Sequence, residues 1–120
     1  MIINSFSNAK PYEAPNHFDC RSLRLAGFSD QGPENFWVGC SHFLPGGKAG
    51  PDISPLEKVY VILSGKLTVI AGGETKIAGP MDTVYIPGNE EREIRNDGND
   101  VVTMIVAMPY PEGVNPKGEK

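Results

Sequence analysis

Among the residues of this chain that could perform chemistry are its 11 lysines and arginines. A guanidinium can bind a carboxylate through two parallel hydrogen bonds, and a lysine ammonium supplies a point charge. A lysine that is partly desolvated beside another cation has a lowered pKa, so it can act as a general base or form a Schiff base. If a lysine and an arginine meet, they predict a site for a small carboxylate or keto acid.

Residue types that bind metals are sparse. The chain has two histidines and two cysteines, and the cysteine spacing is not that of a metal site. Cys40 and His42 are two residues apart and would share one face of a strand, where Asp52 could complete a displaced metal site. Such neighbours are more often plain members of a core or surface face. His17 stands alone, and we expect Cys20 to be a free thiol like Cys40.

Composition restricts the class of protein. A chain of 120 residues, 39% of them hydrophobic, fits one domain with its own core. The net charge of −4, with no cluster of Lys and Arg, argues against nucleic acid or an anionic membrane as the main partner. The N-terminal sequence lacks the pattern of a signal peptide, and no apolar run has the length of a membrane span. We therefore expect a cytoplasmic protein.

The elements that must position these residues are short strands. The 14 glycines and 11 prolines leave little room for long helices, and Gly72-Gly73 is a strong hairpin signal. Irregular segments are expected at 1–16, as an arm, and at 109–120, as a loose tail. Trp37 and Tyr85 are expected to pack in the core. The predicted strands cover residues 17–26, 35–44, 58–63, 66–71, 74–78, 82–86, 91–96 and 101–108. This spacing is typical of an all-β antiparallel barrel or double sheet.

The sequence GGKAGPDISPLEKVYVILSG, which runs from Gly46 to Gly65, resembles the first conserved motif of the cupin family. In cupins that motif reads Gly, five residues, His-x-His, three or four residues, Glu, six residues, Gly. Both glycines are present here. The positions of the metal ligands are taken instead by Asp52, Ser54 and Lys58.

The sequence MDTVYIPGNEEREIRN resembles the second cupin motif, which reads Gly, five residues, Pro-x-Gly, two residues, His, three residues, Asn. Pro87 and Asn96 fit the pattern. Met81 and Asn89 stand where glycines are usual, and Arg92 stands where the last ligand histidine would be. The resemblance is close in the second half of the chain only, and in the first half it rests on the number of strands.

This resemblance implies a single cupin domain over residues 1–120, with a jelly-roll or double-stranded β-helix barrel. It also implies that the usual metal is not bound. Lys58 and Arg92 would point two positive charges at the place of the cation, where each costs about 4 kcal/mol at 4 Å and an effective dielectric of about 20, before the divalent charge doubles it. One carboxylate, Asp52, does not offset that. We expect no metal and no cofactor.

On the cupin alignment, the barrel interior holds both cations and several polar residues. The candidate catalytic residues are Lys58, Arg92 and Asp52, and the candidate substrate-binding residues are Ser54, Tyr60, Asn96 and His42. With the cations in excess by about one charge, such a pocket suits a small anion. Asp52 or Tyr60 could pass a proton. Asn96 precedes Asp97-Gly98, so turn capping also explains it.

The functional hypotheses fall into three classes. The first is a metal-independent cupin that binds or acts on a small carboxylate or keto acid, with isomerase, decarboxylase or lyase chemistry. The second is a non-catalytic module for ligand binding or assembly, in which Asp52, Lys58 and Arg92 only balance one another's charge. The third is a divergent metal-dependent dioxygenase. The resemblance also implies a homodimer, paired through sheet edges and the N-terminal arm.

Overall fold

The strands of the chain pair in antiparallel fashion, and one of them, β3 (Phe36–Asp52), is much longer than the others. The computed structural model describes residues 1–117. Its elements are η1 (Phe6–Asn8), β1 (Lys10–Tyr12), β2 (His17–Ala26), β3 (Phe36–Asp52), β4 (Lys58–Ser64), β5 (Leu67–Ala71), β6 (Glu74–Ala78), β7 (Thr83–Ile86), β8 (Arg92–Arg95) and β9 (Val102–Pro109). The prediction of an all-β antiparallel fold is confirmed.

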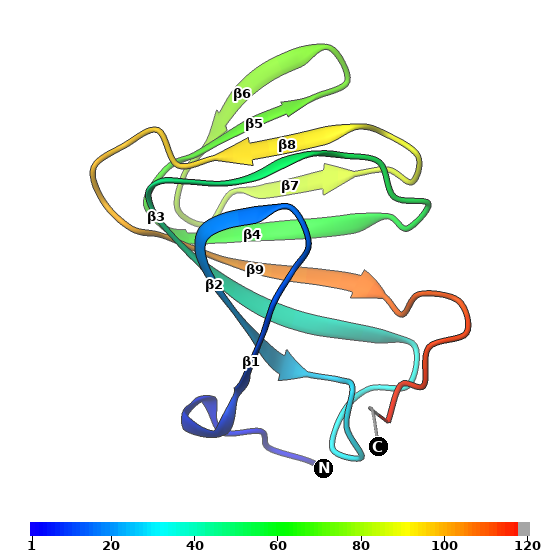
Figure 1. The fold of residues 1–120 in the computed structure, drawn as a ribbon. Helices are drawn as coiled ribbons and strands as arrows, with labels where there is room; N and C mark the ends of the chain where they lie inside the picture. Colours follow the sequence, from blue (N-terminus) through cyan, green and yellow to red (C-terminus); the bar gives the residue numbers. More distant parts are fainter. Residues whose placement is uncertain (118–120) are drawn as a thin grey trace.

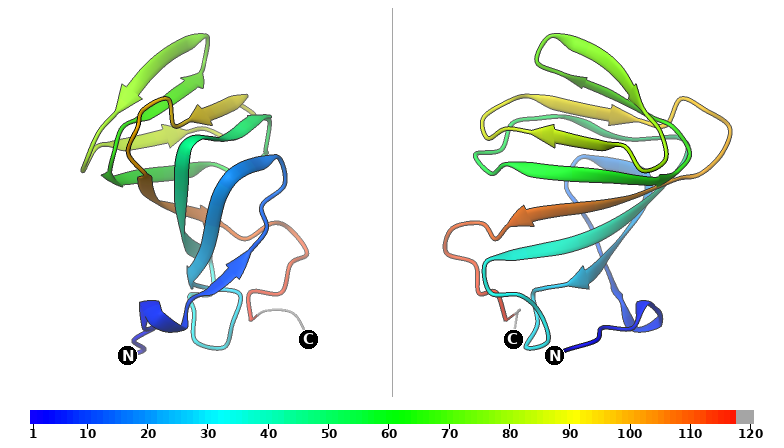
Figure 2. Two further views of the ribbon diagram at one scale, coloured as in Figure 1. Left: turned by 60° about the vertical axis from the view of Figure 1, so that its left-hand side comes forward. Right: turned by 180° about the vertical axis from the view of Figure 1, so that it is seen from behind.

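One curled sheet forms the whole molecule. The strand order is β6-β5-β8-β3-β9-β4-β7, and the β1-β2 hairpin is joined through β2 to β3. The sheet rolls up until its edges β6 and β7 come to the same side, which makes a nearly closed barrel (Figure 1). Seen from two other directions, the N-terminus and the described end of the chain lie on one side of the molecule, and the β5-β6 hairpin lies on the opposite side (Figure 2).

Strand β3 holds the two halves of the barrel together. Its first part, through Phe43, pairs with β9, and its last part, from Lys48, pairs with β8. Gly46, with φ of +85°, lies at the corner between the two parts. The sequence predicts that this strand ends at residue 44, because Pro45-Gly46-Gly47 has the composition of a loop. That boundary is wrong: these residues bend the strand without ending it.

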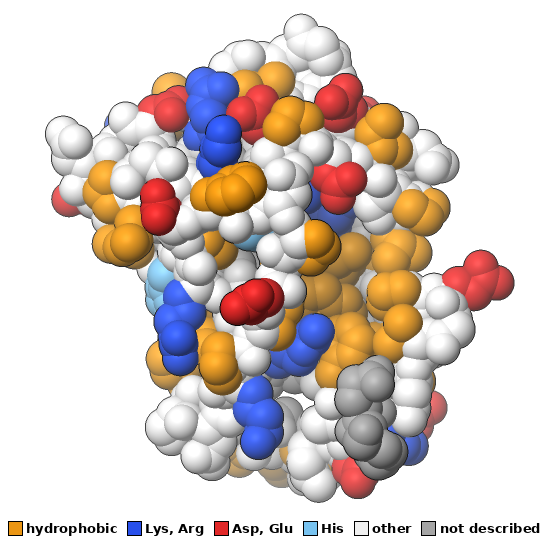
Figure 3. Space-filling view, viewed as in Figure 1, with side chains coloured by type: hydrophobic (Ala, Val, Ile, Leu, Met, Phe, Trp, Pro, Cys, Tyr) orange, Lys and Arg blue, Asp and Glu red, His pale blue; other side chains and the backbone are white. Residues whose placement is uncertain are grey.

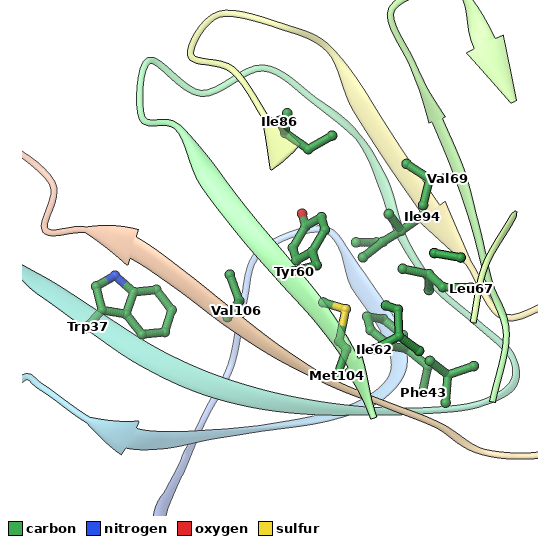
Figure 4. Close-up of a cluster of buried hydrophobic side chains, with 13 residues drawn as sticks. Trp37, Phe43, Tyr60, Ile62, Leu67, Val69, Ile86, Ile94, Met104 and Val106 are labelled. Carbon is green, nitrogen blue, oxygen red and sulfur yellow. The ribbon is translucent and has the colours of Figure 1, made fainter. Parts of the chain in front are cut away.

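The hydrophobic core fills the interior of the barrel. Side chains that are almost completely buried include Phe43, Ile62 and Leu67. Figure 4 shows Phe43 and Leu67 at one end of this cluster and Trp37 at the other, with Tyr60 between them. Trp37 belongs to the core, as expected. Tyr85 does not, since it is exposed on the edge strand β7, where its hydroxyl donates to Glu57 at 2.9 Å.

The N-terminal arm is more ordered than the sequence predicts. Residues 1–16 contain the short helix η1 and the strand β1, whose residues Lys10 and Tyr12 are paired with Arg24 and Ser22 of β2. Three residues including Pro11 give too weak a strand pattern to recognise in the sequence. The arm thereby adds a wall to the barrel within the same chain. Within residues 1–117, no helix has the length and hydropathy needed to cross a bilayer.

Candidate binding cavity in the barrel

A cavity of about 270 Å³ opens into the barrel at the end where Trp37 lies. It is large enough for a small organic molecule, since a water molecule occupies about 30 Å³ in the liquid. Its walls are formed by Tyr12, Glu13, Ala14, Pro15, His17, Arg24, Trp37, Ser41, Asp52, Ser54, Lys58, Tyr60, Arg92, Met104, Val106 and Met108. Figure 3, drawn in the direction of Figure 1, shows hydrophobic side chains gathered in a hollow on the right-hand side, with basic side chains beside them.

Lys58 begins strand β4 and is buried, with only 7% of its surface exposed. Its Nζ donates one long hydrogen bond, of 3.4 Å, to the carbonyl of Leu56. Burial lowers the pKa of the Lys58 ammonium, and the neighbouring charge of Arg92 lowers it further, whereas Asp52 acts in the opposite direction. The charged form of Lys58 is therefore destabilised in the folded protein.

Arg92 begins strand β8 and faces Lys58 from the other half of the barrel. The residue is 8% exposed, and its Nη1 donates to the carbonyl of Gly50 at 3.1 Å. Its Nε is buried and has no acceptor. Next to it lies Tyr60, whose pKa is raised by burial although the charge of Arg92 works against that rise. A hydrogen bond between Arg92 and the Tyr60 side chain also lowers the pKa of Tyr60. Of the five N–H groups of the guanidinium, one is thus held by Gly50, and the Nε–H is left without an acceptor.

The carboxylates that line the cavity do not neutralise these cations by direct contact. Asp52 and Glu13 are both exposed residues, and Asp52 Oδ1 accepts a hydrogen bond from the amide of Ile53 at 2.9 Å. None of the ion pairs within residues 1–117 joins Asp52 to Lys58 or Arg92. The acids thus sit at the hydrated rim and the cations are buried. This arrangement differs from a closed charge network that only balances itself.

Most of the predicted site residues lie around this one cavity. Asp52, Ser54, Lys58, Tyr60 and Arg92 all line it. Ser54 comes from the loop between β3 and β4, where its Oγ accepts a hydrogen bond from the amide of Leu56 at 3.1 Å. The alignment to the two motifs places each of these side chains toward the barrel interior, and each of them lines the cavity.

Two predicted substrate-binding residues lie elsewhere. His42 is on the outer face of β3, where its Nδ1 is 3.0 Å from Thr103 Oγ1 and its Nε2 is 3.8 Å from the thiol of Cys40. Asn96 lies past the end of β8, away from the cavity, and its Nδ2 donates to the carbonyls of Phe43 and Asp100. Neither residue is among those that line the cavity. For Asn96 the alternative of turn capping holds, because its Oδ1 accepts from the amide of Gly98 at 3.0 Å.

The sequence did not point to a second group of cavity residues from the N-terminal half. Arg24 of β2 lies between aromatic rings, with its Cζ 4.1 Å from the ring centre of Tyr12 and 3.7 Å from that of Phe28. The ring centre of Trp37 lies 5.3 Å from the same Cζ atom. His17, at the other end of β2, also lines the cavity, and burial lowers the pKa of its imidazole. The only available signal was a charged residue on the inward face of a predicted strand.

The cavity residues do not fit the metal that cupins commonly hold. The positions of the family's ligands carry Asp52, Ser54, Lys58 and Arg92, of which one alone is an anionic donor and two are cations. The displaced site is not formed either, because Cys40 and His42 lie on the outer face while Asp52 lines the cavity. No cluster of three His, Cys, Asp or Glu residues suited to a metal occurs among residues 1–117.

Comparison with known proteins agrees with the motifs. Over 111 residues, the chain is 35% identical to a protein of Mycobacterium tuberculosis named beta-D-galactosidase, covering 92% of this chain and 96% of that protein. Among solved structures, the polyketide cyclase RemF from Streptomyces resistomycificus superposes with a TM-score of 0.80 at 18% identity, over 91% of this chain and 79% of the other.

Two other solved structures share the fold at similar distance. A predicted oxalate decarboxylase from Thermotoga maritima has a TM-score of 0.78 at 16% identity, over 92% of this chain and the whole of the other. KdgF from a Halomonas species has a TM-score of 0.74 at 13% identity, over 92% and 94%. Likeness at this identity concerns the fold alone. Residues 40–108 match the model of the cupin domain, which is more than half of the chain, so this protein is a member of the cupin family.

Proposed function

We propose that this cupin binds a small carboxylate or keto acid between Lys58 and Arg92, without a metal ion. The observation that carries the proposal is the burial of both cations on one cavity, with no ion pair to an acid among the described residues. Buried charges are costly unless they are paired. A carboxylate in the cavity would supply the missing anion and would accept the free Nε–H of Arg92.

The same residues are suited to proton transfer next to that carboxylate. Because burial and Arg92 lower the pKa of Lys58, a larger fraction of its amine is neutral than in a solvated lysine. A neutral amine can remove a proton from the carbon next to a carbonyl. It can also condense with a β-keto acid, losing water, to a protonated imine whose nitrogen accepts the electron pair when carbon dioxide leaves. Tyr60 or Asp52 would return the proton, which gives isomerase, decarboxylase or lyase chemistry.

Covalent chemistry at Lys58 can be tested with pyruvate and sodium borohydride. Reduction of a pyruvate imine leaves a stable adduct, which intact-mass and peptide mass spectrometry locate. We expect the adduct at Lys58 in the wild-type protein and none in Lys58→Met, whereas the matched variant Lys66→Met, which lacks a lysine outside the cavity, still forms it. Adduct spread evenly over the lysines, or none at any concentration, would remove the imine route and leave binding alone.

Glycoside hydrolysis is a second candidate, favoured by the relative named beta-D-galactosidase and by the two carboxylates, Asp52 and Glu13, that line the cavity. Glycosidases use a pair of carboxyl groups on either side of the bond they cleave. Release of nitrophenol from nitrophenyl β-D-galactoside would support this candidate if it is lost in Asp52→Asn and in Glu13→Gln. Release that both variants retain, or no release, would leave the carboxylate-binding proposal in place.

A further inference from the structure

The cavity has a second cationic end around Arg24, which the two family motifs do not include. Its guanidinium is stacked between the rings of Tyr12 and Phe28, with Trp37 completing the group. Stacking fixes the plane and the direction of the guanidinium while leaving its edge donors free. We call these four residues the Arg24 cage.

The cage is built rigidly. Gly27 has φ of +109°, and a Cβ on it would lie 2.5 Å from Trp37 Cβ, so only glycine fits there. Phe28 follows with φ of +55°, an uncommon conformation for a bulky residue, and its amide donates to the hydroxyl of Tyr110 at 3.4 Å. Tyr110 in turn donates to the carbonyl of Pro33 at 2.6 Å. Several separate segments therefore hold Arg24 in one position.

Two donors of the cage have no acceptor. Arg24 Nη1 and Trp37 Nε1 are both buried and without a hydrogen-bond partner, and Trp37 is only 7% exposed. No ion pair within residues 1–117 involves Arg24, although Glu13 lines the same cavity. Unsatisfied buried donors are rare in proteins, because each of them destabilises the fold.

The Arg24 cage is separate from the Lys58 and Arg92 end. Arg24 pairs with Gly39, Gly39 with Val106, and Val106 with Tyr60, so Arg24 and Tyr60 stand three strands apart in one row. At about 4.8 Å between strands, that is roughly 14 Å along the sheet. Arg92 lies on the opposite half of the barrel, next to Asp52. A ligand with two anionic groups can place one of them at each end.

We propose that the ligand of this cavity is a small dicarboxylate, with one carboxylate between Lys58 and Arg92 and the other at the guanidinium of Arg24, beside Trp37. This inference rests on the proposed carboxylate site and makes it more specific. Arg24 is then a specificity residue that selects two-ended ligands over one-ended ligands. Met104, Val106 and Met108 supply an apolar wall for the carbon chain between the two ends.

The single tryptophan of the chain provides the measurement, because Trp37 lies in the cage. We would titrate the wild-type protein with malonate, succinate and glutarate and with the matched monocarboxylates propionate, butyrate and valerate, following tryptophan fluorescence and, independently, heat. We expect at least one dicarboxylate to bind ten-fold or more tightly than its monocarboxylate. In Arg24→Met that ratio should fall to about one, whereas Arg21→Met, an exposed arginine of the same strand, should keep it.

The outcomes separate this inference from the proposed function. If monocarboxylates and dicarboxylates bind equally well to the wild-type protein, and Arg92→Met weakens both, the carboxylate site stands and the dicarboxylate is wrong. If neither class binds, both proposals fail. If Arg24→Met does not fold, the comparison is made in Arg24→Lys and in the wild-type series, which needs no variant. If Arg24→Met and Arg24→Lys both keep a ten-fold preference for the dicarboxylate, the role of Arg24 is contradicted.

Discussion

The two ends of this barrel differ in how their buried polar side chains are hydrogen-bonded. We call the end at Phe43 and Asn96 the closed end, and the end at Trp37 and Arg92, where the cavity lies, the open end. At the closed end, Asn96 is 1% exposed, and three hydrogen bonds to the chain itself satisfy both its amide nitrogen and its oxygen. Four residues earlier, at the open end, Arg92 is 8% exposed and keeps a buried Nε with no acceptor. The first arrangement is what stability requires. The second leaves a buried donor that none of the described residues satisfies. On our proposal, this difference separates structural from ligand-binding residues.

The largest effect on stability is expected at the closed end. Asn96→Ala removes three hydrogen bonds, one of them to the buried residue Phe43, so we expect a loss of about 3 kcal/mol in the free energy of unfolding. The melting temperature should fall by about 10 °C. Asn99→Ala, an exposed change in the same loop, is the control and should melt as the wild type does. A loss below about 1 kcal/mol would mean that the two ends do not differ in this way.

The largest effect on binding is expected at the open end. Arg92→Met keeps much of the side-chain volume and removes the buried charge, so we expect pyruvate to bind at least ten-fold more weakly while the melting temperature stays equal or rises. Arg95→Met is the matched control, because Arg95 is on the same strand but is paired with Asp97 at the surface at 3.2 Å. A strongly destabilised Arg92→Met with unchanged affinity would assign Arg92 to the structural class.

A pH-dependent effect is expected at Lys58. Because burial lowers the pKa of this ammonium in the folded state, the charge is disfavoured there at every pH below that pKa. Lys58→Met should therefore raise the stability at neutral pH, and the gain should shrink as the pH rises from the lowered pKa towards 10.5. Thermal unfolding between pH 7 and 10.5 measures it. A gain that grows with pH would show that the sign of the shift is wrong.

The affinity for carboxylates should depend on the protonation state of Lys58. The protonated Lys58 attracts the anion, so the affinity for pyruvate should decline at a pH below the usual range for lysine. The decline should be missing in Lys58→Met. Titration calorimetry across the same pH range tests this, and an affinity that rises with pH in the wild type would contradict the account.

The smallest effects are expected outside both ends. His42→Ala removes a contact of 3.0 Å to Thr103 on the outer face, so it should change the stability by about 1 kcal/mol at most and leave pyruvate affinity within two-fold. Calorimetry beside Arg92→Met makes the comparison. A ten-fold loss of affinity in His42→Ala would show that the outer face communicates with the cavity.

The sequence predicted the barrel because its turns are marked by residue type. Gly72 and Gly73 both adopt positive φ between β5 and β6, at the position that the hairpin signal indicates. It misplaced the end of β3, because a Pro-Gly-Gly corner between two sheet partners has the same composition as a loop. Period two correctly put Cys40 and His42 on one face, but it does not say which face points inward.

The candidate cavity could be predicted only in part for a related reason. The motif spacing fixes which strand positions of β4 and β8 point inward, and so it identified Lys58 and Arg92. The Arg24 cage depends on contacts among β1, β2 and the loop after Gly27, which are far apart in the sequence and carry no local pattern. Whether Asn96 is satisfied by the chain or free for a ligand is likewise decided by tertiary contacts.

The most direct test of the central claim is the NMR signal of the Arg92 Nε–H, assigned with Arg92→Lys, before and after addition of pyruvate. If a ligand carboxylate accepts this hydrogen bond, the signal should shift and exchange more slowly with water, while that of Arg95 stays unchanged. If saturating pyruvate binds and the Arg92 signal does not move, or if pyruvate does not bind, then the buried cations of the open end do not form a carboxylate site.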